Sequence, residues 1–429
     1  MTKQSFKLGN VVKSAVASPA GFRSNLRSVV ALAAICLTGF TFFASCGEPP
    51  EPPPANEAIE LKSPITENTT LKDLGLPIDY FYAGDNFLQV KNGAILTIED
   101  SVTIQFTKTN GGIEIIDGAT IKALGTANKR IQFVGGATKG SWSRIWVKTE
   151  KDNIFNYVDF INGGSQTHTT NRYGVFALDN AKASISHCKI LGGLADGIVM
   201  WDKCNITAFD NNIVENVDRA PVYMRNEFSK LSKFDMTSTF TNNTNKYIEV
   251  EGSQFIREDV TLNKTSVPYY FTYGPNITDE KRLTINEGVT IYMGENIGIT
   301  NYNGTGKLTI NGSIANPVTF TRLPGTSYHW NLINFEGGTG HIINNCVLEY
   351  GGAKPATNQE NCILKINAAQ ITLNNVIIRN SLARGVVVDN FGGAPSISAT
   401  NVTFANNGDC NVYVFRPVEG CYNSFEEMP

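Results

Sequence analysis

The chain has 429 residues, which is long enough for two or three ordinary domains. Its formal net charge is −3. Residues 1–45 hold five basic side chains and no acidic one, so the rest of the chain is net acidic. A nucleic-acid partner is therefore not expected, because phosphate binding needs a basic surface stripe.

Residues 1–46 are typical of an export signal. A basic segment ends at Arg27, and the apolar run VVALAAICLTGFTFFA extends from Val29 to Ala44. The sequence FASCG around Cys46 resembles a bacterial lipobox. This resemblance implies cleavage before Cys46 and acylation of that residue, which would make the chain an outer-membrane lipoprotein, periplasmic or surface-exposed. The alternatives are a plain secretory signal and an uncleaved anchor.

Residues 47–62, GEPPEPPPANEAIELK, are predicted to form a linker. Its closely spaced prolines favour an extended, semi-rigid spacer. The acidic Glu48 and Glu51 soon after Cys46 resemble the surface-export signals of Bacteroidetes lipoproteins. The alternative is an ordinary flexible tail.

Residues 63–408 show the pattern of a β-solenoid. Apolar residues alternate with polar ones over short segments, as in Leu96-Thr-Ile98, Leu308-Thr-Ile310 and Ile371-Thr-Leu373. A period of two indicates strands, and frequent Asn and Gly indicate the turns between them. We therefore predict an all-β, right-handed, single-stranded parallel β-helix. The asparagines are expected to adopt left-handed backbone at corners and to form ladders between coils.

The solenoid sequence contains an internal duplication. We predict two similar halves, at about 70–225 and 255–408, and a less regular stretch at 226–251 that is either an insertion or a poorly matched coil. The residues Ile121, Gly125, Phe133, Trp142 and Ile145 recur at a nearly constant spacing as Leu308, Gly312, Phe320, Trp330 and Ile333.

One repeat resembles a known family. Residues 306–321 follow the pattern G-x-L-x-x-x-G-x-x-x-N-P-V-x-F-T, and Trp330 to Ile333 and Tyr350 to Gly352 continue it. This arrangement is similar to repeats of secreted right-handed parallel β-helix proteins of the pectate-lyase-like superfamily, common in Bacteroidetes. The resemblance implies the fold but does not specify an activity. At the Gly of the family's W-x-G-I motif this chain has Arg144 and Leu332.

Residues 409–429 leave the repeat and are expected to cap the last coil, because an open strand edge invites aggregation. Cys410 and Cys421 bracket a hairpin-like segment, so a disulfide between them is predicted. Cys188 and Cys346 are expected in the core. The pairing of these two and of the two further cysteines stays open. The further cysteines are Cys204 and Cys362.

No metal or cofactor site is expected from the sequence. A CxxC pair is missing, and the histidines are scattered without the spacing of metal ligands.

The late coils of the first half carry the best cluster of candidate binding residues. Tyr173 and Trp201 could stack on sugar rings, and the charged residues could bind hydroxyl groups. The alternative is an ordinary solvated face. The predicted ligand-binding residues are Arg172, Tyr173, Asp196, Trp201, Asp202, Tyr223 and Arg225.

We therefore expect a lipid-anchored protein without catalytic activity that binds a polysaccharide or another cell-surface ligand, or serves as an adhesion scaffold. The alternative is a polysaccharide lyase or glycoside hydrolase, for which Asp202 and Arg219 are weak catalytic candidates. An enzyme needs a groove in which carboxylates or bases converge.

Overall fold

The computed structural model describes residues 57–165, 172–226, 228–252, 255–302, 304–353, 361–416 and 419–428. The predicted signal at 1–46, including Cys46, lies outside these residues, as does most of the predicted linker. Within the residues described, no helix has the length and apolar character needed to cross a bilayer.

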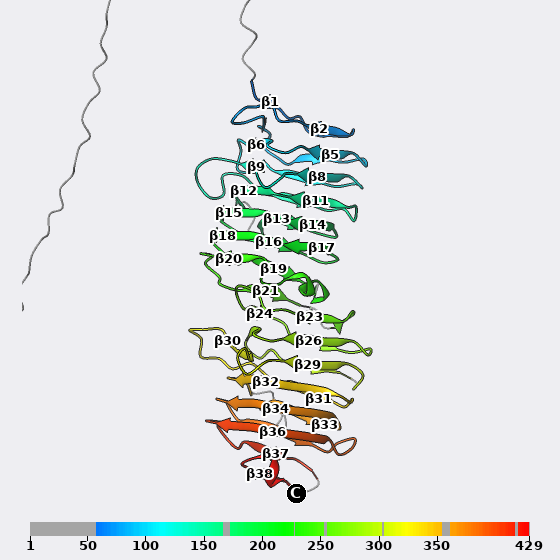
Figure 1. The fold of residues 1–429 in the computed structure, drawn as a ribbon, viewed down its shortest axis with the longest axis vertical. Coiled ribbons are helices and arrows are strands. Elements are labelled where there is room, and N and C mark those ends of the chain that lie inside the picture. Colours follow the sequence, from blue (N-terminus) through cyan, green and yellow to red (C-terminus); the bar gives the residue numbers. More distant parts are fainter. Residues whose placement is uncertain are drawn as a thin grey trace, which may run out of the picture. The chain divides into compact units, whose positions relative to one another are not determined.

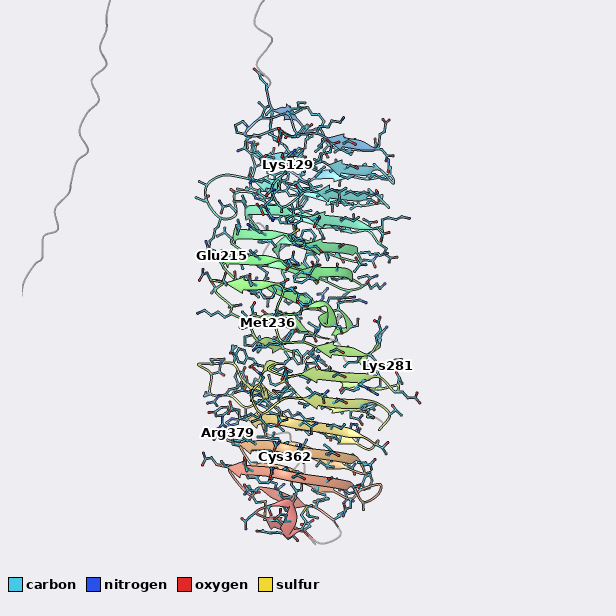
Figure 2. The ribbon with its side chains drawn as sticks, in the orientation of Figure 1. Lys129, Glu215, Met236, Lys281, Cys362 and Arg379 are labelled. Atoms are coloured by element: carbon cyan, nitrogen blue, oxygen red, sulfur yellow. A yellow bond between two sulfur atoms is a disulfide. The ribbon has the colours of Figure 1, made fainter. Side chains whose placement is uncertain are left out.

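The compact unit that begins at Asn56 is a parallel β-solenoid, with about 13 turns in its described part (Figure 1). This confirms the predicted all-β β-helix. Side chains at the corners point away from the stack in Figure 2, where Glu215 and Arg379 lie at one edge and Lys281 lies at the other.

The described strands form four sheets, and two of them run through the first part of the chain. Sheet 1 contains β1 (Ile59–Glu60), β3 (Tyr80–Tyr82), β6 (Thr103–Phe106), β9 (Ile131–Val134), β12 (Val158–Gly163), β15 (Lys189–Gly193), β18 (Ile213–Val217) and β20 (Thr239–Thr241). Sheet 2 contains β2 (Thr69–Leu71), β5 (Ile95–Ile98), β8 (Thr120–Leu124), β11 (Asn153–Asn156), β14 (Lys182–Ser186) and β17 (Asn205–Asp210).

Sheet 3 runs from the first part of the chain into the second. It contains β4 (Leu88–Val90), β7 (Ile113–Ile115), β10 (Ile145–Val147), β13 (Gly174–Leu178), β16 (Asp196–Met200), β19 (Val222–Arg225), β21 (Ile248–Glu251), β24 (Tyr269–Phe271), β27 (Thr290–Met293) and β30 (Val318–Arg322). The long β32 (His341–Glu349) joins these strands to a second row, β23 (Val260–Leu262), β26 (Arg282–Asn286) and β29 (Lys307–Asn311). On its other side β32 pairs with β34 (Gln370–Arg379), and β34 pairs in turn with β36 (Ser396–Ala405).

Sheet 4 belongs to the second part of the chain. It contains β22 (Phe255–Ile256), β25 (Asn276–Ile277), β28 (Ile299–Asn301), β31 (Ile333–Glu336), β33 (Cys362–Asn367), β35 (Arg384–Asp389), β37 (Val412–Val414) and β38 (Gly420–Tyr422). Two 3₁₀-helices complete the elements, η1 (Phe228–Lys233) and η2 (Phe425–Glu427).

The interior is a column of alternate side chains from every coil. Ile98, Ile310 and Leu373 are all fully buried, as their period of two predicts. Phe106, Phe133 and Phe160 occupy successive coils of sheet 1, and their rings stack with centres 6.3 and 5.5 Å apart. Each coil thus covers the apolar face of the next, which is how a solenoid builds one core from many short strands.

The two repeated tryptophans have the same surroundings. The indole N–H of Trp142 donates to the carbonyl of Ile161 at 2.7 Å, and a Cβ on Gly163 would lie 2.8 Å from the indole ring. Trp330 likewise donates at 2.7 Å to Glu349, and a Cβ on Gly351 would lie 2.9 Å from its ring. In both copies the glycine leaves room for a buried tryptophan, which explains why these residue types recur together.

The stretch around residues 226–251 marks a change of sheets. Sheet 1 ends at β20 and sheet 4 begins at β22, while sheet 3 continues through the pairing of β21 with β24. As a result, equivalent residues of the two copies lie in different sheets. Ile104 is in sheet 1 and its counterpart Ile291 is in sheet 3, and Ile145 is in sheet 3 and its counterpart Ile333 is in sheet 4.

An asparagine ladder crosses the corner of the last coils. The side chain of Asn375 donates to Asn345 at 3.1 Å, and Asn401 donates to Asn375 at 3.0 Å. All three residues have positive φ, between 47° and 53°. The predicted ladder and the left-handed corners are therefore confirmed here, since Asn tolerates this conformation and its amide both donates and accepts.

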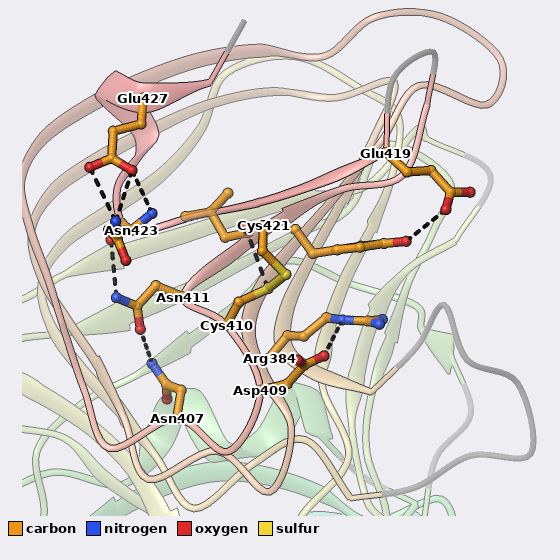
Figure 3. The surroundings of a disulfide bond; sticks show 11 residues. Arg384, Asn407, Asp409, Cys410, Asn411, Glu419, Cys421, Asn423 and Glu427 are labelled. Carbon is orange, nitrogen blue, oxygen red and sulfur yellow. Dashed lines mark hydrogen bonds and ion pairs between the residues drawn. A yellow bond between two sulfur atoms is a disulfide. The ribbon is translucent and has the colours of Figure 1, made fainter.

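The two ends of the solenoid are built differently from each other. β1 begins at Ile59, before the expected start at residue 63, and pairs with β3. At the other end β37 adds a further parallel strand, and β38 then pairs with it in antiparallel orientation. A disulfide joins Cys410 and Cys421 in this cap, with Cα atoms 5.8 Å apart (Figure 3).

Candidate functional site

The outer face of sheet 3 carries a column of large side chains. Residues paired across neighbouring strands stand about 4.8 Å apart along the stack and point the same way. From β4 to β27 this column consists of Gln89, Glu114, Trp146, Ala177, Val199, Tyr223, Glu249, Tyr270 and Tyr292.

Two small residues in the column create a recess between larger ones. Ala177 and Val199 point outward yet are fully buried, and with Trp201 and Tyr223 they form an apolar cluster separate from the solenoid core. Trp146 packs against this cluster, and its ring meets that of Trp201 edge-on with centres 5.8 Å apart. The outer face therefore has an aromatic floor of its own.

A depression of about 270 Å³ opens over this floor. Three basic side chains line it, and among the described residues of the lining Asp179 is the one carboxylate. A concave site with aromatic walls and a few polar groups is the usual form of a small-ligand pocket. The lining consists of Arg144, Trp146, Lys148, Tyr173, Asp179, Trp201 and Arg225.

Arg144 is held between aromatic rings at one side of the depression. Its guanidinium carbon lies 4.4 Å from the ring centre of Trp146 and 4.3 Å from that of Tyr173. The side chain is only 3% exposed. Burial lowers the pKa of Arg144 to about 10, against the opposing effects of Tyr173 and Glu114, so the group stays cationic at neutral pH.

Glu114, the carboxylate that acts electrostatically on Arg144, has other partners. Glu114 accepts hydrogen bonds from Gln89 at 3.0 Å and from Lys148 at 3.4 Å. Among the described residues, Nε and Nη1 of Arg144 have no hydrogen-bond partner although both atoms are buried. Buried polar atoms are rarely left in this state.

A buried ion-pair network adjoins the depression. Asp196 is fully buried, accepts a hydrogen bond from the backbone N–H of Ala220 at 2.9 Å, and lies 3.9 Å from Arg219. Arg172 bridges Asp196 and Glu249, and its guanidinium carbon lies 4.5 Å from the ring centre of Tyr223. These groups are already paired with one another within the outer face.

Asp202 is paired at the rim. It accepts hydrogen bonds from Arg225 at 3.2 Å and from Asn226 at 2.7 Å. The hydroxyl of Tyr223 donates to Glu251. Both candidate catalytic residues, Asp202 and Arg219, are thus in ion pairs, and neither residue lines the depression.

The structure therefore divides the predicted site residues into two groups. Tyr173, Trp201 and Arg225 line the depression, and the others belong to the adjoining networks. Sequence reasoning missed Arg144 and Trp146. The replaced Gly of the W-x-G-I motif was the available signal for Arg144.

No protein family, curated protein or solved structure matches this chain. The function must therefore be argued from the site itself.

One group of potential metal ligands occurs in the described part of the chain. Asp409, Cys410 and Cys421 offer ligand atoms within 4.8 Å of one another. Because the two cysteines form a disulfide, they cannot supply the thiolates that bind metals.

Proposed function

We propose that the protein is a lipid-anchored surface protein that binds a glycan without cleaving it. The observation that carries the proposal is the open depression whose walls are the rings of Trp146, Tyr173 and Trp201. Indole and phenol rings present an apolar face together with a polar group, which matches the apolar C–H faces and polar hydroxyl groups of sugars. Tyr270 and Tyr292 extend the aromatic column along the stack, so a chain of several sugars has further rings to contact.

Binding is favoured over cleavage because the carboxylates of Asp196 and Asp202 already form ion pairs. A hydrolase needs two carboxyl groups on opposite sides of a glycosidic bond. Asp196 and Asp202 are both paired with arginines, and the described lining of the depression has Asp179 alone.

One observation favours the enzyme alternative. Burial raises the pKa of Asp196 to about 6, against the opposing effects of Arg172 and Arg219, and raised carboxyl pKa values occur at catalytic acids. Asp196 is fully buried beneath Arg172, however, so a lyase or hydrolase would require that ion pair to open first.

The lipid anchor is a separate part of the proposal and rests on Cys46. Metabolic labelling with a radioactive fatty acid should label the wild-type protein in the membrane fraction. The Cys46→Ser variant should remain unlabelled. Equal labelling of both proteins would contradict the assignment of Cys46, and absence of label in the wild type would contradict acylation.

Glycan binding is tested by calorimetric titration with a panel of neutral and acidic oligosaccharides. We expect at least one glycan to bind, and Trp201→Ala to weaken its binding roughly tenfold through loss of a stacking surface. Tyr302→Ala is the matched control, since Tyr302 is an exposed aromatic residue outside the depression. New double bonds or reducing ends in the same samples would instead support an enzyme, and absence of binding across the panel would refute the proposal.

A further inference from the structure

The buried guanidinium of Arg144 interacts with Tyr173 but keeps two nitrogen atoms without a hydrogen-bond partner among the described residues. Its two faces are covered by Trp146 and Tyr173, while Nε and Nη1 have no hydrogen-bond partner among the described residues. Arg144 lines the depression. Leaving a buried charged donor unpaired is costly, so this arrangement needs a compensating acceptor.

The fold itself does not require an arginine at this position. The corresponding residue in the second copy is Leu332, which is also buried and has no charge to satisfy. An apolar residue can therefore occupy the position. The buried charge of Arg144 is therefore not a requirement of the fold, which favours a role in binding.

Other charges around the depression favour an anion. Lys148 lies 4.3 Å from the ring centre of Trp146, and Arg225 forms part of the same lining. Glu114, the carboxylate that acts on Arg144, is engaged by Gln89 and Lys148. The described lining of the depression itself carries three cations and one carboxylate, Asp179, while Glu114 and Asp202 pair with Lys148 and Arg225 from outside the lining.

We propose that Arg144 is an oxyanion-binding residue and that the ligand carries a carboxylate or sulfate group that accepts a hydrogen bond from its guanidinium. Hydrogen bonds between a guanidinium and such a group are charge-assisted and therefore strong. The inference rests on the proposed function, since it specifies the kind of glycan that the depression binds.

The experiment compares three tetrasaccharides of similar size, one neutral, one of uronic acids and one sulfated. At low salt we expect the wild type to bind one of the two anionic probes roughly 10- to 100-fold more tightly than the neutral one. Whichever anionic probe binds better identifies the oxyanion as carboxylate or sulfate. In Arg144→Met the preference should disappear. In Arg144→Lys, which keeps the charge but lacks the planar guanidinium, it should fall in part.

Arg322→Met is the matched control, because Arg322 also packs on an aromatic ring, that of Tyr350 at 4.1 Å, but does not line the depression. The wild-type preference among probes does not depend on any variant folding. Equal affinity for neutral and anionic probes would overturn the oxyanion site and leave glycan binding intact, as expected if ordered water satisfies Arg144. Lack of binding to all three probes, together with an unresponsive wider panel, would refute both proposals.

Discussion

Nη1 of Arg172 lies 3.4 Å from both carboxylate oxygens of Asp196, which is fully buried. Arg172 precedes β13 and Asp196 begins β16, so this pair links one coil to the next. The protonation state of Asp196 therefore makes the stability of the protein depend on pH.

The first prediction concerns that pH dependence. Burial raises the pKa of Asp196 from its ordinary 3.8 to about 6, so the folded protein binds this proton more tightly than the unfolded chain. The contribution of Asp196 to stability is fully present below about pH 4 and is lost as pH rises through about 6, by roughly 3 kcal/mol. Asp196→Asn should remove this part of the pH dependence in urea unfolding between pH 4 and 7.

Asp202→Asn serves as the control for Asp196, because Asp202 is half-exposed at the rim and also pairs with an arginine. An unchanged pH dependence in Asp196→Asn would show that Asp196 titrates as it does in the unfolded chain.

The asparagine ladder predicts a position-specific loss of stability. Asn375 holds the middle of the ladder, so Asn375→Ala removes two side-chain hydrogen bonds and places alanine at a φ of 53°. We expect a loss of about 2 kcal/mol in the free energy of unfolding. Asn296→Ala, at a φ of 59° but outside the ladder, should lose less in the same denaturation experiment. Equal losses would mean that the ladder bonds contribute nothing.

The phenylalanine stack predicts a larger effect. Phe133 lies between Phe106 and Phe160 and is fully buried, so Phe133→Ala should cost roughly 3–5 kcal/mol through the cavity it leaves. Phe391→Ala should cost far less, since Phe391 is 62% exposed. Thermal unfolding followed by circular dichroism compares the two. A small change in Phe133→Ala would indicate that neighbouring coils collapse into the space.

Burial also predicts the reactivity of two thiols. It raises the pKa of Cys188 to about 12 and raises that of Cys346 as well, so the nucleophilic thiolate is scarce at both sites. In the native protein neither residue should react with iodoacetamide at pH 8, whereas both should react in guanidinium chloride. Peptide mass spectrometry locates the label. Rapid native labelling at either residue would contradict its place in the core.

The disulfide of the cap predicts a local effect. It closes a loop with a sequence separation of 11, and Asn411, Asn423 and Glu427 hydrogen-bond beside it (Figure 3). The variant Cys410→Ser/Cys421→Ser should lower protection of β37 and β38 by roughly 2–3 kcal/mol in hydrogen exchange. Strands such as β10, many coils away, should exchange as in the wild type, and uniform loss throughout would contradict a local role.

Sequence periodicity predicted the fold class because the inward position repeats at every strand. Ile98 and Leu373 could be placed in the core from their neighbours alone, and Asn345 at a corner from its backbone preference. The change from sheet 1 to sheet 4 could not be predicted. Alternation separates inside from outside, but it does not say which sheet of the next coil a strand will join.

The site was harder to predict for a related reason. A charged residue beside a strand is expected to be solvated, yet Arg144, just before β10, is buried because Trp146 and Tyr173 cover it. Tyr173 lies in the following coil, so this enclosure depends on side chains that are separated in sequence. Aromatic residue types drew attention to these coils, and only the coordinates showed which of the rings enclose a cation.

The reversed direction of β38 has a consequence for self-association. A parallel coil offers the same hydrogen-bonding edge to another coil of its own kind, and stacked repeats could in principle continue from one molecule into the next. At the C-terminal end the neighbour of β37 runs the opposite way. The outer edge of β37 in sheet 4 is therefore already covered and does not offer a parallel template to a second molecule.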